Sequence, residues 1–133
     1  MKINIPELIA HAIKIADNAQ ATYSGFPVGA ALLSTKNQIF TGCNVESSSY
    51  GLSICAERVA LVKALSEGVQ DFHTIVIYAE KADFCPPCGA CRQLLFDYAP
   101  KINVILTNGK EYHSYKLKDL LPNAFEASKL SDK

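Results

Sequence analysis

Two predicted helices in this chain of 133 residues begin at cysteines, and this arrangement constrains the fold more than any other feature. One helix is predicted from Cys55 to Glu67, by its apolar spacing and by the glycine that follows it. The other is predicted from Gly89 to Ala99, directly after Cys88, which forms a Cys-x-x-Cys pair with Cys91. Residues three apart in a helix share a face, so these two thiols point the same way. A fold in which the two helix starts converge would gather three thiols at one place.

The rest of the chain alternates between helical and strand patterns. A first helix is predicted from Pro6 to about Ala19, where apolar residues recur at helical spacing. Strands are predicted from apolar and β-branched runs at Val28–Leu33, Ile39–Val45, His73–Ala79, Ile102–Thr107 and Glu111–Tyr115. Residues 34–38 and the pair Asn108-Gly109 are typical of hairpin turns. We therefore expect an α/β fold in one domain over residues 1–133, a three-layer α/β/α arrangement with a mixed sheet of about five strands, the last two antiparallel.

Charge and hydropathy argue against several classes of partner. Lysine plus arginine number 13 and aspartate plus glutamate number 13, so the formal net charge is zero. A nucleic-acid partner is not expected, because such proteins usually carry a basic excess that neutralises phosphates. Charged residues interrupt the apolar positions near the N-terminus, and no apolar run reaches the ~20 residues that cross a bilayer. We expect no membrane partner and a cytoplasmic protein, whose cysteines serve as thiols or metal ligands rather than as disulfides.

The cysteine spacing predicts a catalytic zinc site. The helix dipole favours thiolates at helix N-termini, and thiolate sulfur is a zinc ligand. Cys55, Cys88 and Cys91 would hold one Zn2+ per chain and leave a fourth position for water, as catalytic zinc sites do. Glu57 would stand beside that water without being a ligand and would move its protons. Taken alone, Glu57 is equally typical of an acid that serves the helix dipole.

The cysteines also allow other interpretations. The Cys88–Cys91 pair by itself suits a redox dithiol or two buried packing cysteines. A non-enzymatic zinc-binding module would prefer four protein ligands, and the three histidines show no ligand-like spacing. Cys85 is held extended ahead of the helix by the two prolines that follow it, and we set it aside as a ligand. Cys43 lies in a predicted strand and is expected in the core.

A zinc ion held by three thiolates would need a nearby positive charge, and an arginine could supply it. Three thiolates around a divalent zinc leave a formal charge of −1, which weakens the metal as a Lewis acid. Arg58 is our candidate for offsetting this charge, by donating to the sulfurs of Cys55 and Cys88. Arg92 is a second candidate, and the alternative for Arg58 is an ordinary surface arginine.

The motifs around these residues resemble the zinc signature of the cytidine deaminase family. They read Cys55-Ala56-Glu57-Arg58 and Pro87-Cys88-Gly89-Ala90-Cys91-Arg92-Gln93. Further stretches resemble the same family in matching order, at Tyr23–Leu32, Thr41–Glu46 and Leu121–Phe125. The resemblance covers about residues 20–126 and is to the short, three-cysteine form, which assembles as a homotetramer. It implies zinc-dependent hydrolytic deamination of cytidine and deoxycytidine to uridine and deoxyuridine, with release of ammonia, in pyrimidine salvage.

The resemblance also implies which residues contact a nucleoside. Asn44 and Glu46, on one face of a predicted strand, would hydrogen-bond the ribose hydroxyls. Phe26 would pack against the base or the sugar, and the backbone around Ala56 would donate to the pyrimidine carbonyl. Without the resemblance, the polar pair is typical of solvent-facing residues and Phe26 of a core residue.

Two residues are expected to act across subunits. Tyr50 and Phe125 match positions that neighbouring subunits contribute to the site in this family, so the active site would be complete only in the homotetramer.

Two related enzyme classes are rivals. A blasticidin-S-type deaminase shares the zinc motif and the size, although the Asn44 and Glu46 pair favours ordinary nucleosides. Deaminases that edit nucleic acids usually have a histidine ligand and a helix before the last strand. The Asn108-Gly109 hairpin leaves no room for that helix.

Overall fold

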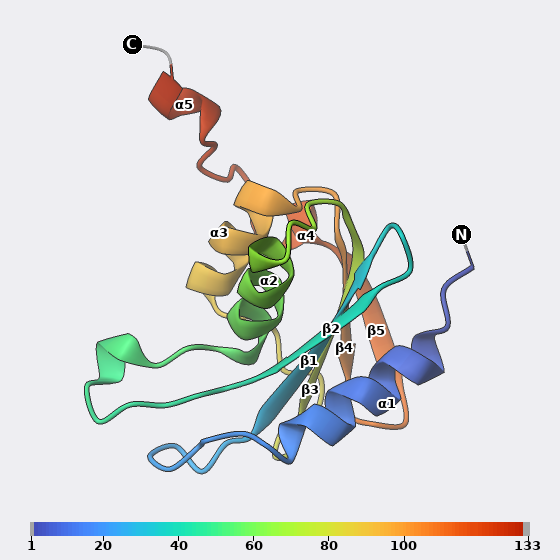
Figure 1. Ribbon diagram of the computed structural model, residues 1–133, viewed down its shortest axis with the longest axis vertical. Coiled ribbons are helices and arrows are strands. Elements are labelled where there is room, and N and C mark those ends of the chain that lie inside the picture. The colour runs from blue at the N-terminus through green and yellow to red at the C-terminus, as the bar shows by residue number, and fades with distance from the viewer. Residues whose placement is uncertain (1, 132–133) are drawn as a thin grey trace.

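Five strands form one mixed sheet in the computed structural model, which describes residues 2–131 (Figure 1). Their order across the sheet is β2 (Ile39–Cys43), β1 (Val28–Ser34), β3 (Phe72–Ala79), β4 (Asn103–Thr107) and β5 (Tyr112–Lys116). β3 and β4 run parallel, and the other neighbouring pairs are antiparallel. The predicted α/β fold, with a mixed sheet and an antiparallel final pair, is confirmed.

Helices cover both faces of the sheet and complete three layers. α1 (Ile5–Ala16) packs on one face, whereas α2 (Ala56–Ser66) and α3 (Gly89–Tyr98) pack on the other (Figure 1). Both layers are needed because the central strands are apolar on both sides. This arrangement leaves the N-termini of α2 and α3 on the same side of the sheet.

Two hydrophobic cores fill the spaces between these layers, since successive side chains of a strand point to opposite faces. On β1, Ala30 and Leu32 belong to the core under α2 and α3, while Ala31 and Leu33 belong to the core under α1. These four side chains are at most 3% exposed. β3 and β4 alternate between the two cores in the same way. The near-continuous apolar runs of the sequence therefore reflect strands that are buried on both faces.

α1 begins at Ile5, one residue before the predicted start, and ends earlier than predicted. The side-chain oxygen of Asn4 caps it by accepting a hydrogen bond from the Glu7 backbone N–H at 3.0 Å. The last helical residue is Ala16 rather than Ala19. The N–H groups of residues 17–19 bond carbonyls three positions back, so the chain leaves the helix through tighter turns.

Several boundaries differ from the sequence prediction. β2 ends at Cys43 rather than Val45, because Val45 forms isolated bridges with Gln20 and Ile54 instead of continuing the ladder. The β4–β5 ladder closes at Thr107 and Tyr112, which leaves a four-residue connection, and there only Gly109 has a positive φ, of 98°. A two-residue type I′ turn would need positive φ at both of its central residues.

Three short helices were not predicted from the sequence. They are η1 (Tyr50–Leu52), α4 (Leu117–Leu120) and α5 (Ser128–Ser131). Each is about one turn long, too short to show an apolar period. Within residues 2–131, no helix is both long and apolar enough to cross a bilayer.

Gly42 of β2 sets how closely α2 approaches the sheet. A Cβ atom at this position would lie 2.5 Å from the carbonyl oxygen of Ala56 and 2.5 Å from the backbone nitrogen of Ala60. Both contacts are with helix backbone, which cannot move aside as a flexible side chain could. The glycine therefore fixes the position of the first turn of α2, which carries Cys55 and Glu57.

Candidate functional site

Three cysteine sulfurs meet between the starts of α2 and α3. The Sγ of Cys88 lies 3.9 Å from that of Cys55 and 3.4 Å from that of Cys91, and all three lie within 4.8 Å of one another. Sulfurs around a tetrahedral zinc with Zn–S bonds of ~2.3 Å are about 3.8 Å apart. The three residues predicted as ligands are therefore positioned to bind one metal ion, and thiolate ligands suit zinc.

Helix capping explains why the sulfurs converge. Cys55 is the N-cap of α2 and Cys88 is the N-cap of α3, both with extended backbone. Cys91 lies in the first turn of α3, where its N–H donates to the Sγ of Cys88 at 3.5 Å. The sulfurs of both N-cap residues therefore lie at the positive ends of two helix dipoles, which favours thiolate, and that of Cys88 also accepts a capping hydrogen bond. The predicted convergence of two helix starts is confirmed.

The pKa values of Cys55 and Cys91 are shifted in opposite directions. Hydrogen bonds from Cys91 and Cys88, with the charge of Arg58, outweigh burial and lower the pKa of Cys55 to about 5. The pKa of Cys91 is raised, first by its hydrogen bond to Cys55 and then by burial. A thiolate therefore forms readily at Cys55. Cys91 keeps its proton, because it donates a hydrogen bond to that thiolate and because a second negative charge at this separation would be repelled. Three thiolates need a cation among them, so the cluster fits a divalent metal ion.

Glu57 brings a carboxyl group beside the sulfurs. It is the second residue of α2 and its side chain is only 5% exposed. Burial raises the pKa of Glu57 from 4.5 to about 7, and the negative charge of Cys55 acts in the same direction. A hydrogen bond from Cys91 to the carboxylate partly opposes this shift. A carboxyl group with a pKa near neutrality can both accept and return a proton.

Arg58 lies against the cluster, where its charge and its hydrogen bond both lower the pKa of Cys55. Its Nη2 donates to the backbone oxygen of Ser53 at 2.9 Å, and its Nε is buried without a hydrogen-bond partner among the described residues. After the hydrogen bonds from Cys91 and Cys88, the charge of Arg58 is the next cause of the lowered pKa of Cys55. Its proposed role in balancing charge at the sulfurs stays a prediction.

Arg92, the second arginine candidate, is placed elsewhere. Its Nε donates to the Pro87 oxygen at 2.8 Å and its Nη1 to the Leu120 oxygen at 2.6 Å. The guanidinium therefore ties the loop before α3 to the end of α4 through two backbone oxygens rather than through sulfur.

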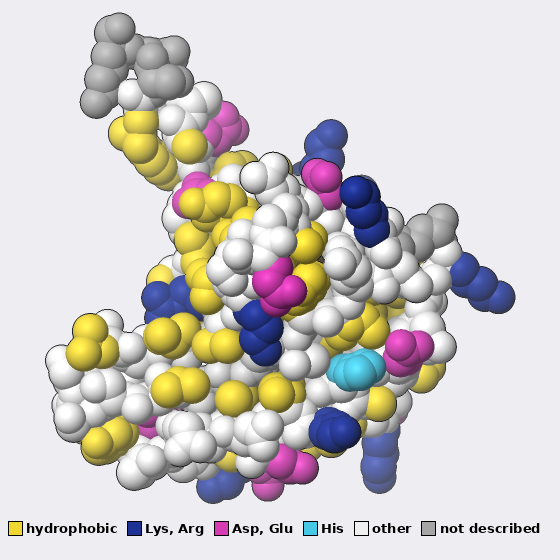
Figure 2. Space-filling model, in the orientation of Figure 1, with side chains coloured by type: hydrophobic (Ala, Val, Ile, Leu, Met, Phe, Trp, Pro, Cys, Tyr) yellow, Lys and Arg dark blue, Asp and Glu magenta, His cyan; other side chains and the backbone are white. Residues whose placement is uncertain are grey.

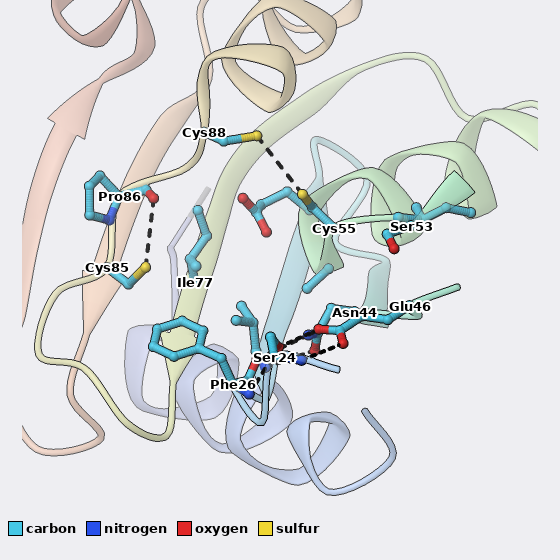
Figure 3. Close-up of a pocket in the computed structure, with 14 residues that line it drawn as sticks. Ser24, Phe26, Asn44, Glu46, Ser53, Cys55, Ile77, Cys85, Pro86 and Cys88 are labelled. Atoms are coloured by element: carbon cyan, nitrogen blue, oxygen red, sulfur yellow. Dashed lines mark hydrogen bonds between the residues drawn. The ribbon is translucent and has the colours of Figure 1, made fainter. Parts of the chain in front are cut away.

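A cavity of about 370 Å³ opens in front of the sulfur cluster (Figure 3). It is lined by the segment before β1, the segment after β2, the start of α2, β3 and the loop before α3. Five of the predicted catalytic and substrate-binding residues line it: Phe26, Asn44, Glu46, Ala56 and Glu57. Its volume falls within the range of small-molecule sites, roughly 300–1,000 Å³.

Asn44 and Glu46 lie just beyond β2 and contact each other. The Asn44 Nδ2 donates to Glu46 Oε2 at 3.4 Å and to the Phe26 carbonyl oxygen at 3.0 Å, while its Oδ1 accepts from the Val28 N–H at 2.9 Å. Figure 3 shows the two polar side chains together at one end of the cavity, near Ser24. Asn44 therefore shapes the segment that carries Phe26, and its Oδ1 keeps one lone pair for a ligand.

Glu46 is held by the loop before β1. Its Oε1 accepts backbone N–H bonds from Tyr23 and Ser24, each at 2.9 Å, and its Oε2 accepts from the Ser24 hydroxyl. These bonds, led by the Ser24 hydroxyl, hold the pKa of Glu46 below 4.5. The carboxylate is therefore preorganised as an acceptor at the cavity edge.

Tyr50 and Phe125 do not line the main cavity of their own chain. Tyr50 is 75% exposed on η1, with its ring edge against Tyr23 at a centroid distance of 5.9 Å. Phe125 is 55% exposed near the C-terminal end, and its carbonyl oxygen accepts a hydrogen bond from Gln93 at 3.0 Å. Tyr50 instead lines a neighbouring hollow of its own chain, together with Tyr23, Ser24, Glu46 and Ser53. The contribution of Tyr50 and Phe125 to the site of a neighbouring subunit stays a prediction.

Sequence reasoning missed several cavity residues. Ser24 anchors Glu46, and Ile77 and Cys85 form part of the apolar wall. Cys85 lies outside the group of sulfurs that can share a metal, and Cys43 is half-buried on β2. None of these positions carries a local signal, because they reach the cavity only through the folding of separate segments.

Comparison with known proteins gives one consistent family. The family model for the cytidine and deoxycytidylate deaminase zinc-binding region matches residues 3–107. A cytidine deaminase of Sporosarcina psychrophila is 40% identical over 97% of this chain and 96% of its own length. The crystal structure of a cytidine deaminase from Burkholderia pseudomallei superposes with a TM-score of 0.88 at 41% identity, over 92% of this chain and 100% of that one.

A blasticidin-S deaminase of Bacillus cereus is also similar, at 32% identity over 71% of this chain and 74% of its own length. This match is lower in identity and in coverage than the match to the cytidine deaminase of Sporosarcina psychrophila. The three-sulfur centre, the neighbouring buried carboxyl group and the extent of these matches agree, and the chain belongs to the cytidine and deoxycytidylate deaminase zinc-binding family.

Proposed function

We propose that this protein is a zinc-dependent enzyme that hydrolyses cytidine and deoxycytidine to uridine and deoxyuridine, with release of ammonia. The observation that carries the proposal is a buried carboxyl group, that of Glu57, beside three sulfurs that can share one metal ion, at the inner end of a nucleoside-sized cavity. A structural metal site would not need either the cavity or the buried acid.

Cys55, Cys88 and Cys91 hold the zinc ion in this proposal. Zinc, when bound, supplies Lewis-acid activation of the water that attacks C4 of the cytosine ring. Glu57 takes the proton from that water, delivers it to ring N3 and then assists departure of the amino group as ammonia. The pKa of Glu57, raised to about 7 by burial, suits a group that alternates between base and acid. The buried Nε of Arg58, which has no hydrogen-bond partner within residues 2–131, is a donor available to a neighbouring sulfur.

The remaining cavity residues orient the nucleoside. Glu46, preorganised by Ser24, accepts from a ribose hydroxyl, and the free lone pair of the Asn44 Oδ1 accepts from another. The backbone N–H of Ala56, in the first turn of α2, donates to the C2 carbonyl. Phe26 packs against the base or sugar from the apolar side of the cavity.

We propose further that the enzyme is a homotetramer whose active sites combine residues of different subunits. Exposed apolar side chains lie in the two segments that border the cavity, before β1 and between β2 and α2, and we call them the rim: Tyr23, Val45, Tyr50, Leu52 and Ile54. Figure 2 shows hydrophobic side chains over the left part of the molecule, where Figure 1 places η1 and the loops beside it. Burial of this rim by a neighbouring subunit would remove apolar surface from water and bring Tyr50 and Phe125 to a site.

The remaining expectations follow from this activity. We infer a role in pyrimidine salvage, a cytoplasmic location and a single domain over residues 1–133. The shared sheet and the two cores that span it support the single domain.

A spectroscopic assay for conversion of cytidine to uridine tests the proposal. The purified protein should contain about one zinc per chain and release one ammonia per uridine, and a strong zinc chelator should abolish turnover until zinc is restored. Blasticidin S offered at the same concentration should be a much poorer substrate. A zinc-loaded protein that releases neither uridine nor ammonia would contradict the proposed function, and preferential deamination of the antibiotic would favour the rival.

A further inference from the structure

Cys85 lines the cavity but belongs to no part of the proposed machinery. It lies in the loop between β3 and α3, half-buried, with its Sγ 3.8 Å from the carbonyl oxygen of Pro86. It is not one of the sulfurs that can share a metal ion. Figure 3 shows Cys85 and Pro86 on the wall opposite Cys55 and Ser53. The cavity therefore has two different long walls, one from the start of α2 and one from the loop before α3.

The backbone around Cys85 is held firmly, so this wall has a defined shape. Phe84 has a φ of 49°, which is rare for a bulky residue, and two prolines follow the cysteine. The Phe84 ring stacks on His113 of β5, with a centroid distance of 3.9 Å and an angle of 13° between the planes. The thiol is fixed between a ring anchored on β5 and a stiff Pro-Pro segment, and it is poorly placed to move aside for a ligand.

The arrangement of atoms in the cytosine ring indicates which of its edges faces the wall formed by Cys85 and Pro86. In cytosine, C4 is flanked by N3 on one side and by C5 on the other. The proposed contacts of Glu57 with N3 and of Ala56 with the C2 carbonyl place that edge against the start of α2. The opposite edge, which carries C5, then faces across the cavity toward Cys85 and Pro86, with Ile77 and Phe26 as apolar neighbours.

We propose that Cys85 is a specificity-determining residue that contacts position 5 of the pyrimidine and limits the size of the substituent accepted there. The inference rests on the proposed function and deepens it, because it concerns which 5-substituted nucleosides are deaminated rather than whether cytidine is. A methyl group or a halogen at C5 is similar in size to the sulfur atom that a Cys85→Ala substitution removes.

The test compares 5-methylcytidine, 5-bromocytidine and cytidine as substrates, with kcat/KM for each expressed relative to cytidine. Cys85→Ala should raise the relative kcat/KM of both analogues at least about fivefold, and Cys85→Leu should lower it about tenfold or more. The expected size follows from other pockets, where a change of one methylene group shifts discrimination between substrates roughly 10- to 200-fold. Cys43→Ala is the matched control: it removes the same sulfur from a cysteine that does not line the cavity, and the ratio should stay within about twofold.

The outcomes separate the two proposals. If the wild type and the Cys85→Ala protein both deaminate cytidine but the ratio does not move, the inference is overturned and the proposed function stands. An equal change of the ratio in Cys43→Ala would overturn it as well, because the effect would then be global. If wild-type protein with its full zinc content does not deaminate cytidine, both proposals are wrong.

Discussion

Glu57 is a carboxyl group that the fold buries almost completely and surrounds with sulfur. Such a group normally loses its charge on burial, and its raised pKa of about 7 reflects that cost. The charge of Arg58 and the hydrogen bond from Cys91 partly offset the cost. At the scale of the residue, an acid kept near its neutral point beside a metal site is suited to proton transfer.

Replacement of Glu57 by Gln keeps the size of the side chain and removes its ability to carry a proton. We expect kcat for cytidine to fall by about 10²- to 10⁴-fold. Zinc content should stay near one per chain, because Glu57 is not among the three sulfur ligands. Parallel measurement of uridine formation and of bound zinc checks this, and near-normal turnover would show that another group moves the proton.

The lowered pKa of Glu46 leads us to expect that substrate binding depends on pH. Its hydrogen bonds with Ser24, then Tyr23 and Asn44, lower its pKa below 4.5, so the carboxylate remains ionised at neutral and mildly acidic pH. Its contribution is therefore present throughout that range and is lost only as the pH falls through the lowered pKa. We expect KM for cytidine in the wild type to rise as the pH falls through this lowered pKa, below 4.5. Glu46→Gln should have a higher KM throughout and should lack this acid limb, and an identical acid limb in both proteins would contradict the assignment.

α2 is the element whose placement matters most to the site. Its first turn carries Cys55, Ala56 and Glu57, and its backbone rests directly on Gly42 of β2. A shift of this helix by a fraction of an ångström would move the proposed metal ligand, backbone donor and proton carrier together. The positions of these three groups therefore depend on the close contact between α2 and β2.

Gly42→Ala tests that contact. The added methyl group would lie 2.5 Å from two helix backbone atoms, so α2 must move, and we expect a loss of about 1–3 kcal/mol in the free energy of unfolding. Zinc affinity and kcat should fall with it. Gly51→Ala is the control, because a Cβ there meets nothing within 4 Å. Urea unfolding with zinc analysis measures both, and equal stability of the two variants would contradict the packing argument.

The whole molecule presents an apolar rim beside an open cavity, and this surface predicts how copies assemble. Leu52 is 69% exposed in the rim, and placing a charge there should oppose its burial in an interface. If the protein is the proposed tetramer, Leu52→Asp should shift it toward smaller species in sedimentation experiments and should reduce kcat at low protein concentration. Lys36→Glu, on the exposed β1–β2 turn, should leave both unchanged. Full activity in a Leu52→Asp monomer would contradict a site shared between subunits.

Local patterns predicted the long elements well, and the exceptions have physical causes. The apolar runs of β1, β3 and β4 and the cysteine-capped starts of α2 and α3 depend on neighbouring residues, so the sequence carries them directly. One-turn helices such as η1 and α4 have no period to detect. The end of β2 was misplaced because Val45 changes its bridging partners, which is a tertiary event.

The sequence by itself determined the chemistry of the centre: three thiols at two helix starts, with a carboxyl group two residues after the first of them. Spacing along a helix and the dipole at its end are local properties, so they can be recognised without a fold. Only the tertiary structure decided that Arg58 bonds Ser53, that Glu46 is held by Ser24, and that Cys85 forms a wall opposite α2. These relations join segments that are distant along the chain or depend on side-chain packing, and no local pattern encodes a distance across a cavity.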